Sequence, residues 1–265
     1  MRSYRSTDHD ALPRGRPSTF RVCYTSASTP AAKPLVLFDV DGTMLLTGGA
    51  GMRAMKVVAA ELFGTGFRWD GIVVSGHLDP LIFAEAAALN GLGDDPLHHR
   101  SFRSRYLEEL RRQLERGRAQ VRAMPGIHDS IACLRARGVA TLGLLTGNYG
   151  EAIPLKLAAI GVEPSWFEIT AFGDEAPTRR DLAALAITKY SRRLGMPIDP
   201  RRVVVVGDTP RDVDCAHAHG CFAFAVATGG YGPSELARAG ADLVVSDLSD
   251  PAPLLDTVER LAARC

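Results

Sequence analysis

The chain has 265 residues, of which 46% are hydrophobic and 23% charged. This composition is typical of a globular protein, and the length allows one large α/β domain or a core domain with a smaller insert. The formal net charge of +1 gives no indication of nucleic acid or an anionic membrane as a partner. No apolar run approaches the ~20 residues that span a bilayer.

The cysteine pattern disfavours both a disulfide framework and a structural zinc site. The count is five, which is odd, and no CxxC pair occurs. We therefore expect a reducing, cytoplasmic location.

Residues 1–33 differ from the rest of the chain. They are rich in Arg, Ser and Pro and show no apolar period, so we predict a disordered N-terminal extension. A transit peptide is the alternative, but Asp8 and Asp10 count against it.

Short apolar runs recur from residue 34 onward. Such runs are typical of strands buried on both faces of a parallel sheet. They lie at residues 35–38, 141–145, 203–206 and 221–226, with weaker candidates at 168–172 and 242–245. Helical stripes lie between them, and two of these end at Gly138 and Gly161. The alternation predicts a doubly wound, Rossmann-like α/β core at residues 34–47 and 124–265.

Residues 48–123 break this alternation. Two apolar stripes at helical spacing predict helices there: Met52, Met55, Val58, Ala59 and Leu62 in the first, and Phe102, Tyr106, Leu110 and Leu114 in the second. We expect a helical cap domain inserted after the first strand. The alternative is that these helices belong to the core.

Two aspartates follow the first predicted strand directly, in the run Asp39-Val40-Asp41-Gly42-Thr43. Ligands of open α/β sheets bind at this carboxyl edge. Carboxylates so close together repel each other unless a cation compensates them, and Mg²⁺ prefers such oxygen ligands. Gly42 lets the backbone approach a phosphate closely. A turn stabilised only by local hydrogen bonds is the alternative.

The run at 141–145 ends in Thr146-Gly147-Asn148. A hydroxyl, a free backbone N–H and an expected helix start there favour an anion. Alternatively, Asn148 only caps that helix.

A second acidic pair, Asp208 and Asp212, follows the run at 203–206. If neighbouring strands bring these two together with Asp39 and Asp41, only a metal ion makes that concentration of charge tolerable.

Together these motifs resemble the haloacid dehalogenase-like superfamily of phosphotransferases. Its first motif, DxDGT, corresponds to Asp39–Thr43, its second to Thr146, and its fourth, GDxxxD, to Gly207–Asp212. The resemblance covers about residues 34 to 250 and includes the order of motifs and cap. The subgroup similar to phosphoglycolate phosphatases is indicated by GGAGMRAM at 48–55, SGHLDP at 75–80 and LLTGN at 144–148.

The family's third motif is a basic residue, usually Lys. No Lys lies in the matching region, which offers Arg179 and Arg180 instead. An arginine would hold phosphate in a fork and keep its charge, and we favour Arg179 over Arg180. A surface salt bridge is the alternative.

The resemblance implies a Mg²⁺-dependent phosphatase that acts on a small phosphorylated metabolite. Asp39 would attack phosphorus, and Asp41 would serve as acid and then as base. The implied metal ligands are Asp39, Asp41 through its backbone carbonyl, Asp208 and Asp212. The implied phosphate-binding residues are Gly42, Thr146, Gly147, Asn148 and Arg179.

Two other functions stay open at this point. A sugar phosphomutase of the same family keeps the acid at position 41, and a catalytically silent binding module could use the same fold. The intact Asp39 and Asp41 pair argues against the silent module. We expect a monomer or a homodimer.

The segment Ser75–Pro80 lies between candidate cap helices. Asp79-Pro80 predicts an N-cap followed by proline at the first helical position. His77 is a candidate specificity residue that would donate a hydrogen bond to the substrate. A solvent-exposed loop histidine is the alternative.

Overall fold

The computed structural model describes residues 32–93 and 95–263. The predicted extension at 1–33 therefore falls almost entirely outside the described residues. Ala32–Cys265 forms one compact unit, so the domain boundaries expected at 48 and 123 remain a prediction. Within the described residues, no helix is both long and apolar enough to cross a membrane.

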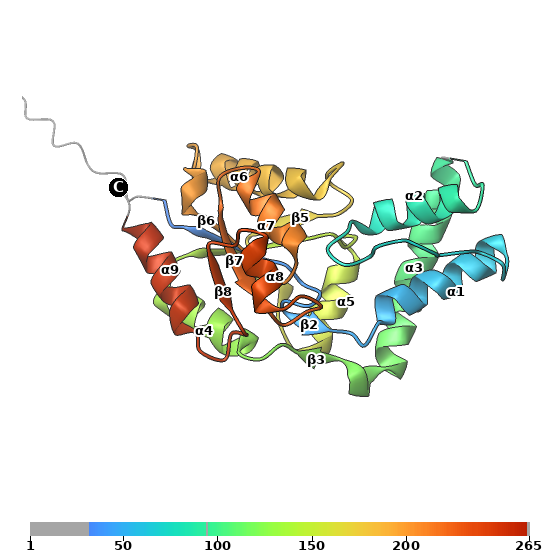
Figure 1. Ribbon diagram of the computed structural model, residues 1–265, viewed down its shortest axis with the longest axis horizontal. Helices are drawn as coiled ribbons and strands as arrows, with labels where there is room; N and C mark the ends of the chain where they lie inside the picture. Colours follow the sequence, from blue (N-terminus) through green and yellow to red (C-terminus); the bar gives the residue numbers. More distant parts are fainter. Residues whose placement is uncertain (1–31, 94, 264–265) are drawn as a thin grey trace, which may run out of the picture. The chain divides into compact units, whose positions relative to one another are not determined.

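Six parallel strands form the central sheet, in the order β5-β4-β1-β6-β7-β8 (Figure 1). They are β1 (Leu35–Phe38), β4 (Thr141–Thr146), β5 (Ile169–Phe172), β6 (Val203–Gly207), β7 (Phe222–Val226) and β8 (Leu243–Val245). Each strand coincides with a predicted apolar run to within one residue at either end. The doubly wound α/β core is confirmed.

The register of β1 determines which side chains meet at the carboxyl edge. Phe38, the last residue of β1, pairs with Leu144 of β4 on one side and with Val206 of β6 on the other. The chain therefore leaves all three strands within two residues of the same level. Side chains just beyond these strands therefore lie at one edge of the sheet, which is where ligands of open α/β sheets bind.

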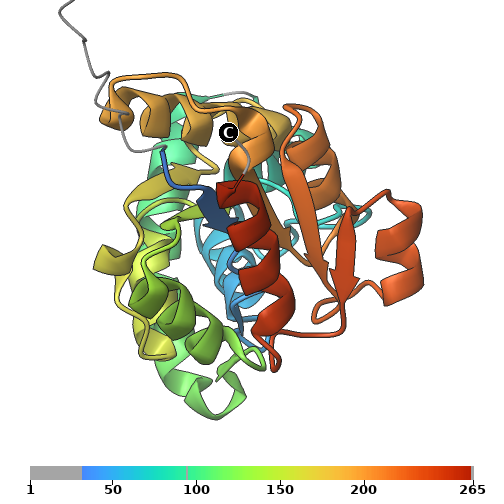
Figure 2. The same cartoon turned by 90° about the vertical axis from the view of Figure 1, so that its left-hand side faces the viewer.

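Helices cover both faces of the sheet because alternate residues of each strand point to opposite sides. Val36 and Phe38 pack in a cluster with residues from α4 (Ile127–Arg137), α5 (Ala152–Ala159) and α9 (Ala252–Ala262). Leu35 and Leu37 pack with residues from α6 (Arg179–Leu194), α7 (Pro210–His217) and α8 (Pro233–Arg238). Figure 2 shows α4 and α9 side by side on one face. Short 3₁₀ helices occur at Arg118–Gln120, Pro164–Trp166 and Pro200–Arg202.

A helical cap follows the first strand, as expected. It contains α1 (Ala50–Phe63), α2 (Asp79–Leu89) and α3 (Pro96–Arg116), which lie together in Figure 1. The chain leaves through β2 (Leu45–Leu46) and returns through β3 (Arg122–Ala123), and these two short strands pair antiparallel. The sequence does not predict this ribbon, because two-residue strands have no detectable period.

Aromatic side chains fill the interior of the cap. The rings of Phe83 on α2 and Phe102 on α3 stack with centroids 4.0 Å apart, and Phe102 also stacks on Tyr106. Phe102 and Tyr106 are almost completely buried. These contacts join two cap helices into one hydrophobic cluster.

We predict that Phe102→Ala lowers the free energy of unfolding by about 3 to 5 kcal/mol, because it removes a buried ring and leaves a cavity. Leu97→Ala on the same helix is the matched control. Leu97 is 61% exposed, so its truncation should change stability by less than about 0.5 kcal/mol. Urea unfolding followed by circular dichroism measures both, and equal effects would contradict the packing described.

Candidate active site

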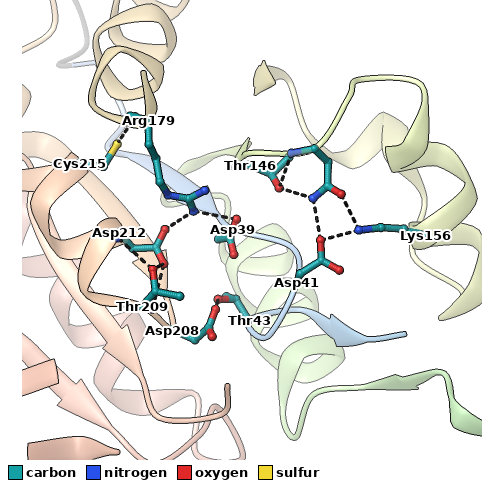
Figure 3. A network of polar contacts seen from close by, with 11 residues as sticks. Asp39, Asp41, Thr43, Thr146, Lys156, Arg179, Asp208, Thr209, Asp212 and Cys215 are labelled. Carbon is teal, nitrogen blue, oxygen red and sulfur yellow. Dashed lines mark hydrogen bonds and ion pairs between the residues drawn. The ribbon is translucent and has the colours of Figure 1, made fainter. Parts of the chain in front are cut away.

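Side chains from three neighbouring strand ends meet at the carboxyl edge of the sheet (Figure 3). Asp39 follows β1, Thr146 ends β4 and Asp208 follows β6. This convergence agrees with the expectation from the sequence, and the level register of β1 with its two neighbours is its cause.

Three buried carboxylates form a cluster at this edge. Asp39, Asp208 and Asp212 each offer an oxygen within 4.8 Å of the others. Burial raises the pKa of Asp39 to about 7, although the charge of Arg179 opposes the rise. Burial, followed by the charges of Asp39 and Asp212, raises the pKa of Asp208 to about 8. The ionised cluster therefore needs cations beside it.

The cluster suits a hard divalent cation, because its donors are all carboxylate oxygens within reach of one ion. Thr43 orients Asp208 by donating from Oγ1 to Oδ1 at 3.0 Å. Gly42 lies so near that a Cβ at this position would stand 2.4 Å from Oδ2 of Asp208. A side chain at position 42 would therefore fill the space in which Asp208 lies.

Arg179 supplies one positive charge to the cluster. Its Nη2 donates to Oδ1 of Asp39 at 3.0 Å and also to Oδ1 of Asp212. Burial opposes the charged form, but the carboxylates of Asp212 and then Asp39 raise the pKa of Arg179 above its usual value. Among the described residues, Nε of Arg179 is buried and has no hydrogen-bond partner.

The two candidates for the third motif, Arg179 and Arg180, lie in different environments. Arg179 is the first residue of α6, after a capping box formed by Thr178 and Asp181. Arg180 instead pairs with Asp214 on the surface, where its side chain is 63% exposed. The structure thus brings Arg179, and not Arg180, to the carboxylates.

Asp212 belongs to the carboxylate cluster and also caps the start of α7 (Pro210–His217). Its Oδ2 accepts from the backbone N–H of Thr209 at 3.0 Å and from Oγ1 of Thr209 at 2.8 Å, as part of the capping box of α7. Its Oδ1 faces Arg179. The helix start therefore holds this carboxylate in place.

Asp41 lies on the side of Asp39 that faces away from Asp212 (Figure 3), and its hydrogen-bond partners differ from those of Asp39. Its Oδ2 accepts from Nδ2 of Asn148 at 2.7 Å and from Nζ of Lys156 at 2.5 Å. The side chain of Lys156 is 4% exposed, whereas that of Asp41 is 43% exposed. Two carboxylates that are two residues apart in sequence are thus compensated by different cations.

Lys156 is not among the site residues predicted from the sequence. A signal was present, because Lys156 stands three residues after Ile153 and four before Ile160, on the apolar side of its predicted helix. A charged residue on such a face needs a buried partner. The partner, Asp41, is 115 residues away in sequence, so no local pattern could identify it.

The alternative that Asn148 only caps the following helix is wrong. The helix α5 begins only at Ala152, and its N-cap is Glu151. The side chain of Asn148 instead donates to Asp41 and Thr146 and accepts from Lys156. Its amide therefore links Asp41, which is 107 residues away in sequence, to Thr146 and Lys156.

The expectation for Asp79 as an N-cap is also wrong. The helix α2 starts at Asp79, and its N-cap is Leu78. Oδ2 of Asp79 accepts from the backbone N–H of Tyr149 at 3.0 Å, and the N–H of Asp79 donates to the carbonyl of Gly147 at 2.7 Å. Burial raises the pKa of Asp79 to about 7, although Lys156 opposes the rise. This residue docks the cap on the loop after β4.

The loop before α2 approaches the core closely. A Cβ at Gly147 would stand 1.9 Å from the carbonyl oxygen of His77, so this approach requires glycine. The imidazole of His77 lies 2.8 Å, Nε2 to Oε1, from Glu85 on α2, and the side chain is 15% exposed. His77 is thus mostly buried and held by its own cap helix.

A pocket of about 370 Å³ opens between the cap and this edge of the sheet. The core contributes polar side chains to it, namely Asp39, Asp41, Thr146, Asn148, Lys156, Arg179 and Asp208. The cap contributes mainly apolar ones, namely Met52, Met55, Val74, Ile82 and Tyr106, together with His77. An anionic group fits the core side, and the cap covers the remainder of a small molecule.

Comparison with known proteins agrees with this geometry. Residues 36–217 match the family model of haloacid dehalogenase-like hydrolases. The phosphoglycolate phosphatase of Synechococcus elongatus is 27% identical over 226 residues, which cover 85% of this chain and 97% of that protein. The phosphoglycolate phosphatase of Chromobacterium violaceum is 31% identical over 160 residues, which cover 59% of this chain and 65% of that protein.

Among solved structures, CbbY from Rhodobacter sphaeroides in complex with phosphate has the same fold. Its TM-score is 0.67 at 23% identity, over 82% of this chain and 96% of CbbY. The family match spans more than half of the chain and includes all the strands that carry the site. The chain belongs to the haloacid dehalogenase-like hydrolases.

Proposed function

We propose that the protein is a phosphatase that hydrolyses a small phosphate monoester through an aspartyl-phosphate on Asp39. The observation that carries this proposal is the contact between the buried Asp39 carboxylate and Arg179 beside the acidic cluster. The relatives named phosphoglycolate phosphatase support the reaction class and make 2-phosphoglycolate the first ester to test.

Asp39 is suited to attack phosphorus because it is buried and held by a cation. Burial raises its pKa to about 7, so at neutral pH a neighbouring positive charge is needed to keep it ionised. Arg179 supplies part of that charge. Arg179, Thr146 and Gly147 line the same pocket, where the guanidinium, the hydroxyl and the backbone N–H would bind phosphate oxygens.

Asp41 is suited to proton transfer. In the first step an oxygen of Asp39 bonds to phosphorus, the ester P–O bond breaks, and the proton of Asp41 passes to the leaving oxygen. In the second step Asp41 takes a proton from water, the water oxygen bonds to phosphorus, and the bond from phosphorus to Asp39 breaks. Free phosphate is released, Asp39 is restored as a carboxylate and Asp41 regains the proton that it donated in the first step.

The carboxylates of Asp39, Asp208 and Asp212 would hold Mg²⁺, with the backbone carbonyl of Asp41. When bound, the ion neutralises charge on the phosphoryl group. The support for this metal is the buried all-oxygen cluster and the raised pKa of Asp208.

We expect Asp39→Asn to lower kcat by at least about 10³-fold, because the nucleophile is lost. Asp214→Asn is the matched control, since Asp214 is an exposed aspartate that pairs with Arg180. Phosphate release from 2-phosphoglycolate and p-nitrophenyl phosphate measures both variants. Isomerised sugar phosphate without phosphate release would instead indicate a mutase. Full activity of a folded, undeamidated Asp39→Asn protein would contradict the proposal.

Metal removal provides an independent test. Exhaustive chelation should abolish turnover, Mg²⁺ should restore it, and Ca²⁺ should substitute poorly because of its looser coordination. Mg²⁺ should also raise the Tm of the wild-type protein through binding. Asp208→Ala should abolish this Mg²⁺-dependent rise in Tm, whereas Asp212→Ala should reduce it by a smaller amount. Activity that survives chelation would rule out the metal.

The third test compares Arg179→Ala with Arg180→Ala. A hydrogen bond to a charged group contributes about 1.5 to 3 kcal/mol, so loss of Arg179 should lower kcat/KM by about 10- to 100-fold. The change should appear in both kcat and KM, because the guanidinium would contact ground and transition states. Arg180→Ala should behave like the wild type. The opposite result would assign the phosphate contact to Arg180.

A further inference from the structure

Lys156 is a charged residue on the apolar side of α5. Its side chain is 4% exposed, and its helix neighbours Ile153 and Leu157 belong to the hydrophobic core. A buried ammonium group is strongly destabilising unless oxygen acceptors surround it. The acceptors of Lys156 therefore identify the groups that stabilise it there.

Two acceptors hold this ammonium group. Nζ donates to Oδ2 of Asp41 at 2.5 Å and also to Oδ1 of Asn148. Nδ2 of Asn148 donates to the same Oδ2 of Asp41 at 2.7 Å, and to Oγ1 of Thr146 at 2.7 Å. Two donors therefore converge on a single oxygen of Asp41 (Figure 3).

The second oxygen of Asp41 is in a different situation. Oδ1 accepts no hydrogen bond from any residue in the described part of the chain, and the Asp41 side chain is 43% exposed. Asp41 lines the same pocket as Asp39 and Thr146. A carboxylate held through one oxygen keeps its other oxygen in a defined direction, where it can exchange a proton.

We propose that Lys156 is a positioning residue for Asp41. Together with Asn148 it fixes Oδ2, so that Oδ1 is presented to the leaving oxygen of the substrate and then to water. This inference rests on the proposed function, because that function gives Asp41 the proton transfers. Lys156 itself does not touch the substrate and acts only through the orientation of Asp41.

The alternative is a purely structural role for Lys156, in which its charge stabilises Asp79 instead of Asp41. Lys156 also lies near the buried Asp79 of α2, and its charge lowers the pKa of Asp79 against the larger effect of burial. However, no hydrogen bond joins these two side chains among the described residues, whereas Lys156 donates directly to Asp41. The geometry therefore favours Asp41 as the group that Lys156 serves.

The first experiment measures Lys156→Met with 2-phosphoglycolate, Lys189→Met being the matched control. Lys189 also pairs with a carboxylate, that of Glu175, outside the pocket. Loss of acid–base orientation should lower kcat by about 10- to 100-fold and change KM by less than about threefold. Lys189→Met should match the wild type. Lys156→Gln, which keeps an amide donor, should recover part of the loss.

The second experiment is a double-mutant cycle with Asp41→Asn. If Lys156 acts through Asp41, Lys156→Met should change kcat by less than about twofold in the Asp41→Asn background. The same substitution in the Asp79→Asn background should keep its full effect. Multiplicative losses with Asp41→Asn, or loss of the effect with Asp79→Asn, would overturn the proposal.

The leaving group supplies a third measurement. p-Nitrophenolate leaves without a proton, so Lys156→Met should retain a burst of p-nitrophenol while the second step becomes slow. Should Lys156→Met fail to fold, Asn148→Ala removes the other donor to Oδ2 and should show the same loss in kcat. Full activity of Asp39→Asn would refute the proposed function. Inactive Asp39→Asn and Asp41→Asn proteins beside a fully active Lys156→Met protein would refute only the positioning role.

Discussion

Negative charge is buried at the carboxyl edge of the sheet, and the arrangement of the site depends on how it is compensated. Asp39, Asp208 and Asp212 place carboxylate oxygens within 4.8 Å of one another, which desolvation and mutual repulsion make unfavourable. Arg179 reaches two of these carboxylates from the first turn of α6. The remaining charge at Asp208 is the physical reason to expect a divalent cation beside it.

The same edge holds a second, separate charge pair. Asp41 is compensated by Lys156 and Asn148, whereas Asp39 is compensated by Arg179. Carboxylates in different surroundings can take different chemical roles, even two residues apart in sequence. In the proposed mechanism this division separates nucleophilic attack from proton transfer. The side chain of Asp39 is buried and that of Asp41 is partly exposed, which agrees with that division.

The cap is connected to this chemistry through the loop after β4. Asp79 of α2 forms hydrogen bonds with the backbone of Gly147 and Tyr149. The carbonyl oxygen of His77 lies where a side chain at position 147 would be, which is possible because residue 147 is glycine. The loop that follows Thr146 therefore contacts both the pocket and the cap. A change in the cap position would alter the groups that surround a substrate, which is consistent with selectivity residing in the cap.

The sequence alone determined the parallel sheet, the helical insert and the carboxyl-edge placement of Asp39, Asp41, Thr146 and Asp208, because strand periodicity and strand-end motifs are local properties. It also favoured Arg179. Only the tertiary structure decided that Arg180 points to Asp214, that α5 begins at Ala152, and that Asp79 binds the core instead of capping α2. It likewise decided that Lys156 belongs to the site. The contacts of Arg180, Asp79 and Lys156 depend on partners tens of residues away in sequence, and the burial of Asp79 and Lys156 exists only once the chain is packed.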